Sequence, residues 1–147
     1  MAGDSHHASI PELARRIQEL TDRQEIGDLV ASLGRWLDDA DFDAGGDLFT
    51  ADVSADTPGG TARGRNAVVA QARRGHEGRR CQHFITDLRT DVRGDRASAE
   101  ANFMVAFAGT TEAEPTRFTG ARYHLQACRE EGRWLLNSVR ITSVWHH

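Results

Sequence analysis

The sequence contains no lysine: all 18 basic residues among its 147 are arginines. This absence excludes Schiff-base chemistry, and with it class I aldolase chemistry and covalent binding of pyridoxal phosphate. It also excludes a phosphate-binding loop of the Walker A type, which needs a lysine. Only two cysteines are present, Cys81 and Cys128, in neither a CxxC pair nor a zinc-binding spacing. We therefore expect no disulfide and no structural zinc site.

Long apolar runs are also missing. No segment approaches the roughly 18 apolar residues that span a bilayer, and the first residues, MAGDSHHASIPELARR, lack the apolar region of a secretory signal. We expect a cytoplasmic protein with no membrane contact. The net charge is −4 and the arginines are scattered, which argues against a nucleic-acid partner. No set of His, Asp and Glu residues has metal-ligand spacing, so no metal is expected.

Length and residue periodicity predict a single domain. A chain of 147 residues can bury one core and is too short for two ordinary domains. We expect residues 1–8 to form a disordered tail and residues 9–147 to form the domain. Capping-box patterns at Ser9–Glu12 and Thr21–Gln24 predict a short helix, then a longer one that ends near Asp39.

Strand patterns fill most of the second half of the chain. Short turns join them, which suits antiparallel neighbours rather than helical crossovers. Because helices come first and strands follow, the predicted class is α+β. After the long helix we expect, in chain order, a short helix ending near Phe49, a strand at 52–56, a helix at 66–74 and strands at 81–92, 96–107, 117–130 and 133–145.

The alternation of apolar and polar residues predicts which strand positions face the core. Every second residue from Ala97 to Phe107 is apolar, and so is every second residue from Ala121 to Ala127. Tyr123, the single tyrosine of the chain, is therefore expected to point inward, and His124 outward. For His83 the pattern leaves both faces open, because it shares its phase with an isoleucine while a phenylalanine lies on the other face.

Three segments, taken in order, resemble the SnoaL-like, nuclear-transport-factor-2-like superfamily, in particular its scytalone-dehydratase-type branch. They are LDDADFDAGGDLFTADV from Leu37, CQHFITDL from Cys81 and GARYHLQACREEGRW from Gly120. The resemblance spans residues 22–145 and implies a curved antiparallel sheet wrapped around N-terminal helices to form a cone with a deep pocket. It also implies a homo-oligomer and enzymes such as dehydratases, dehydrochlorinases, polyketide cyclases and steroid isomerases. These move a proton next to an activated carbon without a metal or an organic cofactor.

The family's acid–base pair falls on Asp38 and His83. The helical wheel alone leaves Asp38 and Asp41 open, and the resemblance favours Asp38. A carboxylate beside His83 would fix the ring tautomer and raise the pKa of the imidazole. Tyr123 is a candidate for polarising a substrate carbonyl. The expected substrate-binding residues are Leu33, Phe103, Val105, Phe107 and Arg140.

The sequence departs from the family pattern at several positions. Apolar residues stand on the strand where scytalone-dehydratase-like enzymes keep a second pocket histidine, and Tyr123 stands where they keep an asparagine. Leu33 and Thr57 replace the tyrosine and the aspartate base of ketosteroid isomerases, which argues against that chemistry.

The leading hypothesis is a lyase, isomerase or cyclase that acts on a hydrophobic, oxygenated, polyketide-like small molecule. Two alternatives remain open. One is a non-catalytic domain of the same fold that binds a small molecule. The other is an interaction protein that dimerises through the outer face of the sheet, with Met104, His124 and Cys128 in the contact.

Overall fold

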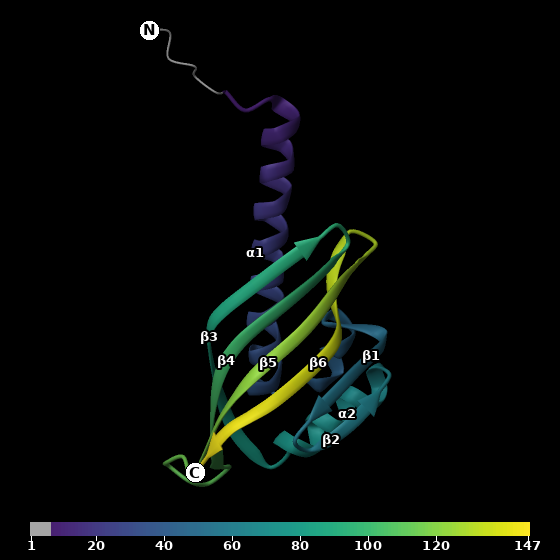
Figure 1. The fold of residues 1–147 in the computed structure, drawn as a ribbon. Helices are drawn as coiled ribbons and strands as arrows, with labels where there is room; N and C mark the ends of the chain where they lie inside the picture. Colours follow the sequence, from purple (N-terminus) through teal and green to yellow (C-terminus); the bar gives the residue numbers. More distant parts are fainter. Residues whose placement is uncertain (1–6) are drawn as a thin grey trace, which may run out of the picture.

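The computed structural model describes residues 7–147, so most of the expected disordered tail lies outside the described residues. The chain folds as an α+β domain, as predicted (Figure 1). None of the helices in the described part is long and apolar enough to cross a membrane. In chain order the elements are α1 (Ile10–Asp38), the 3-10 helix η1 (Phe42–Asp47), β1 (Phe49–Thr57), β2 (Gly60–Arg63), α2 (Arg65–His76), β3 (Arg79–Arg93), β4 (Arg96–Gly109), β5 (Arg117–Glu130) and β6 (Arg133–His146).

Helix α1 is one continuous helix, where the sequence predicted two. Its start is the expected one, because the Ser9 side chain and the Glu12 side chain form the reciprocal capping box. The second pattern at Thr21–Gln24 caps nothing, because α1 continues through it and the Gln24 side chain donates to Asp28 instead. The first half of α1 projects beyond the sheet (Figure 1), which leaves four large apolar side chains exposed: Ile10, Leu13, Ile17 and Leu20.

The six strands form one sheet in the order β2-β1-β6-β5-β4-β3. The four long strands β3 to β6 are antiparallel neighbours, as the short turns predicted, whereas β1 runs parallel to β6. The pairing of β3 with β4 shifts between Thr86 and Arg89, and Asp87 there has a φ of 55°. Such a bulge bends a strand and increases its twist, and the sheet curves so that β3 packs against α1.

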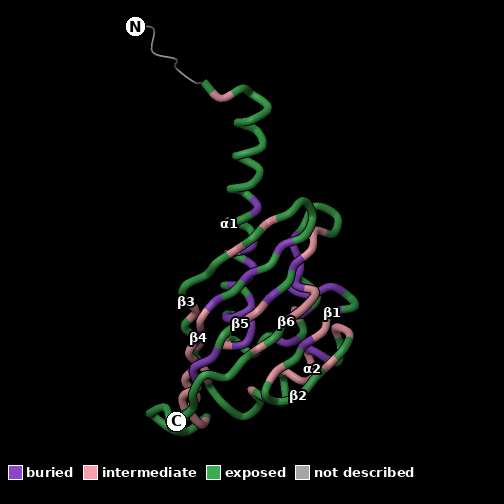
Figure 2. Tube along the Cα trace, viewed as in Figure 1, coloured by how far each residue is buried: buried purple, intermediate pink, exposed green. Residues whose placement is uncertain are grey.

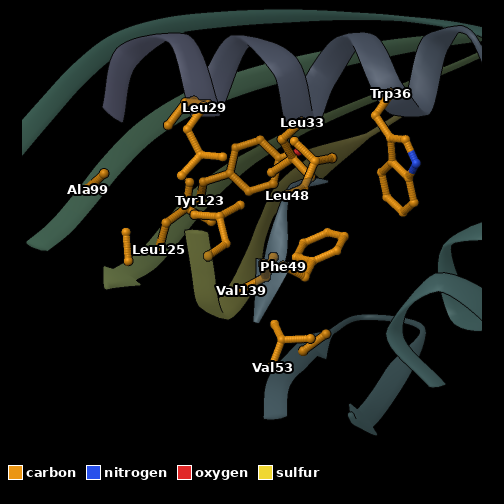
Figure 3. Close-up of a cluster of buried hydrophobic side chains, with 14 of the residues drawn as sticks. Leu29, Leu33, Trp36, Leu48, Phe49, Val53, Ala99, Tyr123, Leu125 and Val139 are labelled. Carbon is orange, nitrogen blue, oxygen red and sulfur yellow. The ribbon is translucent and has the colours of Figure 1, made fainter. Parts of the chain in front are cut away.

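The core lies between the concave face of the sheet and the second half of α1. Figure 2 shows buried positions along β4, β5 and β6. The predicted alternation is confirmed, with alternate residues from Ala97 to Val105 and from Ala121 to Ala127 buried. Helix α1 adds the apolar face that includes Leu29, Leu33 and Trp36 (Figure 3). Trp36 makes edge-to-face contacts that join α1 to η1 and β1.

A buried ion pair joins the middle of α1 to the end of β5, next to the start of β6. Asp22, 4% exposed, accepts two hydrogen bonds from the Arg129 guanidinium at 2.8 and 3.0 Å. Trp134 and Gln18 donate to the same carboxylate. The hydrogen bonds from Arg129 hold the pKa of Asp22 below its usual range, so the stability gained from this carboxylate is present at neutral pH and is lost as pH falls through that lowered pKa.

Replacement of Asp22 by asparagine tests this pair. We expect Asp22→Asn to lower the free energy of unfolding by about 3 kcal/mol, because a guanidinium that is largely buried loses its charged partner. Asp95 also binds Arg129, at 3.0 Å, but its side chain is 81% exposed. We therefore expect Asp95→Asn to cost about 1 kcal/mol or less. Urea unfolding of both variants measures the difference, and equal losses would contradict the role of burial.

Candidate active site

A pocket of about 450 Å³ occupies the inside of the curved sheet. We call it the cone pocket; it is enclosed by the end of α1, by α2 and by the inner faces of β3 to β6. Four of the five residues expected to bind substrate line it: Leu33, Phe103, Val105 and Phe107. The walls are mostly apolar and aromatic, and a volume of this size suits a small organic molecule.

His83 on β3 forms a hydrogen-bonded pair with Asp38, the last residue of α1. Nδ1 of His83 lies 2.7 Å from Oδ1 of Asp38, and the backbone N–H of His83 donates to both carboxylate oxygens at 3.0 and 3.1 Å. An ionised carboxylate only accepts hydrogen bonds, so Nδ1 carries the hydrogen and Nε2 is the ring nitrogen left for a ligand. His83 lines the cone pocket, and Asp38 lies behind it. Asp41, the alternative partner, is exposed.

The surroundings of His83 lower its pKa, whereas a carboxylate partner alone predicted a higher pKa. Its side chain is 3% exposed. Burial disfavours the charged imidazolium, and this effect exceeds the opposing hydrogen bond and charge of Asp38. The predicted direction was wrong because the sequence shows a possible partner but not the depth of burial. His83 is consequently a neutral base at pH 7.

Cys81 lies beside the pair. Its thiol is 3.6 Å from Oδ1 of Asp38, and burial together with that carboxylate raises the thiol pKa to about 12. The donor atoms of Asp38, Cys81 and His83 lie within 4.8 Å of one another, a set that could hold a metal ion and that the sequence spacing did not reveal. Both carboxylate oxygens of Asp38 already accept hydrogen bonds from N–H groups of His83. The arrangement is therefore that of a hydrogen-bonded Asp–His pair with a thiol beside it.

Tyr123 on β5 points inward, as predicted. It is 1% exposed and stacks on Phe103, with ring centroids 4.2 Å apart. Its hydroxyl has no hydrogen-bond partner within residues 7–147, and the same holds for Trp36 Nε1 and Thr119 Oγ1. All three residues line the cone pocket. Because buried polar atoms are nearly always satisfied, these atoms are the groups of the pocket that a water molecule or a ligand with oxygen functions would satisfy.

The SnoaL-like domain model matches residues 18–140, most of the chain. The chain belongs to the SnoaL-like family. This confirms the resemblance seen in the sequence. No curated protein matches the chain.

Several solved structures have the same fold as this SnoaL-like domain. An NTF2-like protein with a cystatin-like fold from Novosphingobium aromaticivorans is 26% identical, with 92% of this chain and 90% of that chain covered and a TM-score of 0.76. A hexachlorocyclohexane dehydrochlorinase (LinA) type 2 is 17% identical, with 90% and 91% covered and a TM-score of 0.79. An NTF2-like superfamily protein from Salmonella enterica is 18% identical, with 86% and 94% covered and a TM-score of 0.78.

The structure of this SnoaL-like protein adds a second pocket histidine that sequence reasoning missed. His76, at the end of α2, lines the cone pocket and stacks on His83 with ring centroids 5.7 Å apart. Its Nδ1 donates to the Ala72 carbonyl at 2.8 Å, which leaves Nε2 as an acceptor. Burial lowers the pKa of His76 as well. The helical spacing of Val68, Ala72 and His76 was a signal that these residues share one face.

Arg140, the fifth expected substrate-binding residue, lies outside the cone pocket of the SnoaL-like protein. It is exposed and lines a separate cavity on the other face of the sheet, where His124 also lies. On β6 the neighbours Val139 and Ile141 face the cone pocket instead. Successive side chains of a strand point to opposite faces, so Arg140 is directed outward and the expectation was wrong.

Proposed function

We propose that this SnoaL-like protein is a lyase, isomerase or cyclase that moves a proton next to a carbonyl of a hydrophobic, oxygenated small molecule. The observation that carries the proposal is the 2.7 Å hydrogen bond between His83 and Asp38 at the wall of a mostly apolar pocket. A neutral imidazole held in one tautomer, with its other nitrogen left without a hydrogen, is suited to act as a general base.

In the proposed reaction, Nε2 of His83 removes a proton from the carbon next to the carbonyl. The ring becomes an imidazolium, and Asp38 stabilises it through the Nδ1 hydrogen bond. The proton then returns to another carbon or passes to a leaving group, which gives isomerisation or elimination. The solved relative named as a dehydrochlorinase, with a similar fold, supports elimination as one of these outcomes.

Tyr123 is proposed to stabilise the negative charge that develops on the carbonyl oxygen. Burial raises the pKa of its hydroxyl, so the group stays protonated and can donate. In a pocket that excludes water, one such donor contributes substantially to the rate. His76 offers Nε2 as an acceptor, which can orient a substrate hydroxyl beside His83.

Deuterium exchange tests the proposal without knowledge of the natural substrate. We suggest 2-tetralone, a hydrophobic ketone with exchangeable protons next to its carbonyl, followed by proton NMR in deuterated buffer. The protein should accelerate exchange above the buffer rate. Binding without acceleration would contradict the proposal and favour the non-catalytic binding domain.

The Tyr123→Phe variant separates a catalytic hydroxyl from a structural one. Since the hydroxyl has no partner within residues 7–147, its removal should leave the melting temperature unchanged or slightly higher. Exchange should slow by about 10²-fold, the usual effect of losing one donor to an oxyanion. Unchanged exchange with lowered stability would show that Tyr123 is a core residue only.

A further inference from the structure

The charged side chains that line the cone pocket are all basic, and the Asp38 carboxylate lies behind this lining, bonded to His83. Of the described residues that form this lining, two are arginines, Arg74 and Arg117, and none is an aspartate or glutamate. Three other cavities of the molecule each mix acidic and basic residues. The whole chain carries a net charge of −4, so a purely cationic lining is opposite to the overall balance.

The two arginines stand at the opening of the pocket. Both are exposed, whereas the floor residues Phe103 and Tyr123 are buried. Arg74 comes from the last turn of α2 and Arg117 from the first residue of β5, so they reach the pocket from different elements. Neither forms an ion pair with a carboxylate in the described part of the chain.

Two guanidinium groups stack on one aromatic ring near this opening. The Arg117 guanidinium lies over the Phe107 ring at 5.5 Å from its centroid, and that of Arg79 lies over the same ring at 5.8 Å. Phe107 itself lines the cone pocket. Stacking on an aromatic face restricts a guanidinium and leaves its N–H groups available to an anion.

These observations separate two parts of the pocket. The interior has neutral donors without a partner among the described residues, and neutral histidines, and both suit carbonyl and hydroxyl oxygens. The opening has guanidinium groups, whose fork of N–H donors matches a carboxylate. An anion in the apolar interior would lose its hydration without a cation nearby, whereas at the opening it would keep water and gain both arginines.

We propose that the ligand of the cone pocket is a hydrophobic carboxylic acid. Its apolar, oxygenated body fills the interior beside His83 and Tyr123, and its carboxylate binds Arg74 and Arg117 at the opening. The assignment of a reacting carbonyl to the interior rests on the proposed function, whereas the carboxylate preference rests on the charges at the opening alone.

A matched pair of probes tests this preference. 2-Naphthylacetate and 2-naphthylacetamide have nearly the same shape and differ in charge. At low salt, calorimetric titration should show the acid binding about tenfold more tightly than the amide, because two partly solvated guanidinium groups pair with its carboxylate. The Arg74→Gln/Arg117→Gln double variant should lose this preference and bind the amide as before.

The control variant carries the same change of charge on the other face of the sheet. Arg122→Gln/Arg140→Gln should keep the full preference for the acid, since both arginines are exposed outside the cone pocket. Equal binding of acid and amide by the unmodified protein, failure of both to bind, survival of the preference in the pocket variant, or equal loss in the control would each overturn the proposal.

The same probes keep this inference separate from the proposed function. A His83→Asn variant should still prefer the acid, even though it lacks the proposed base. If the preference for the acid is present but 2-tetralone exchange is not accelerated, the carboxylate site stands and the catalytic proposal fails. If exchange is accelerated without the preference, the carboxylate site fails alone.

Discussion

Exchange of 2-tetralone should fall by roughly 10²- to 10⁴-fold in a His83→Asn variant, the usual contribution of a positioned general base. Asparagine keeps an N–H donor near the position of Nδ1, so Asp38 retains a hydrogen-bond partner and the fold should persist. The nitrogen that faces the pocket is lost. His124→Asn is the matched control, because His124 forms a similar pair with Glu100, at 3.1 Å, on the outer face. A variant at His83 that keeps full exchange would exclude it as the base.

The pH profile of the unmodified protein should carry the same signature. Exchange needs the neutral imidazole, so the rate should be level above the ordinary imidazole pKa of 6.5 and should fall on the acid side, through the lowered pKa of His83. The folding stability should change with pH in the same direction as the exchange rate. The unfolded chain binds a proton to this ring at a higher pH than the folded chain, so stability declines as pH falls through the lowered pKa. If the exchange rate already declines while the pH is lowered from 8 towards 7, the burial effect on the His83 pKa is contradicted.

The Asp38→Asn variant should lose activity to a similar extent, roughly 10²- to 10⁴-fold, because it reverses the ring tautomer. The single amide oxygen can accept the backbone N–H of His83, and the amide N–H₂ then donates to Nδ1. The hydrogen of the ring moves to Nε2, so the base has no lone pair directed at the substrate.

An NMR titration separates this effect from simple disruption. Asp38 raises the pKa of His83 against the larger effect of burial, so the pKa should fall further in Asp38→Asn. Glu100→Gln, next to His124, is the matched control and should leave His83 unchanged. If the His83 pKa is the same with and without the Asp38 carboxylate, the two residues do not act as a pair.

The strand part of the fold could be predicted best at β4 and β5, because each of these strands has a buried face and a more exposed face. Alternation therefore placed Phe103 and Tyr123 inside and His124 outside. The single helix α1 could not be predicted, since the Thr21–Gln24 pattern indicates a new helix start until the buried contact of Asp22 with Arg129, 107 positions away, is known. Local sequence carries no record of such a distant partner.

The candidate site was predictable in part for the same reason. Asp38 and His83 are 45 positions apart, and no spacing rule joins them, so the family resemblance was needed to favour Asp38 over Asp41. His76 was missed because it ends a helix within a glycine-rich segment that predicts only a break. Arg140 was misplaced because the phase of β6 is ambiguous around it.

The stacked rings of His76 and His83 make the interior of the pocket a shared acid–base unit. Two imidazoles with centroids 5.7 Å apart in a site shielded from water disfavour a second positive charge as soon as one ring is protonated. Their protonation steps therefore belong to the pair rather than to either residue. In the proposed reaction a proton on one ring therefore lowers the proton affinity of the other, so each proton taken from a substrate has to leave before the next is accepted.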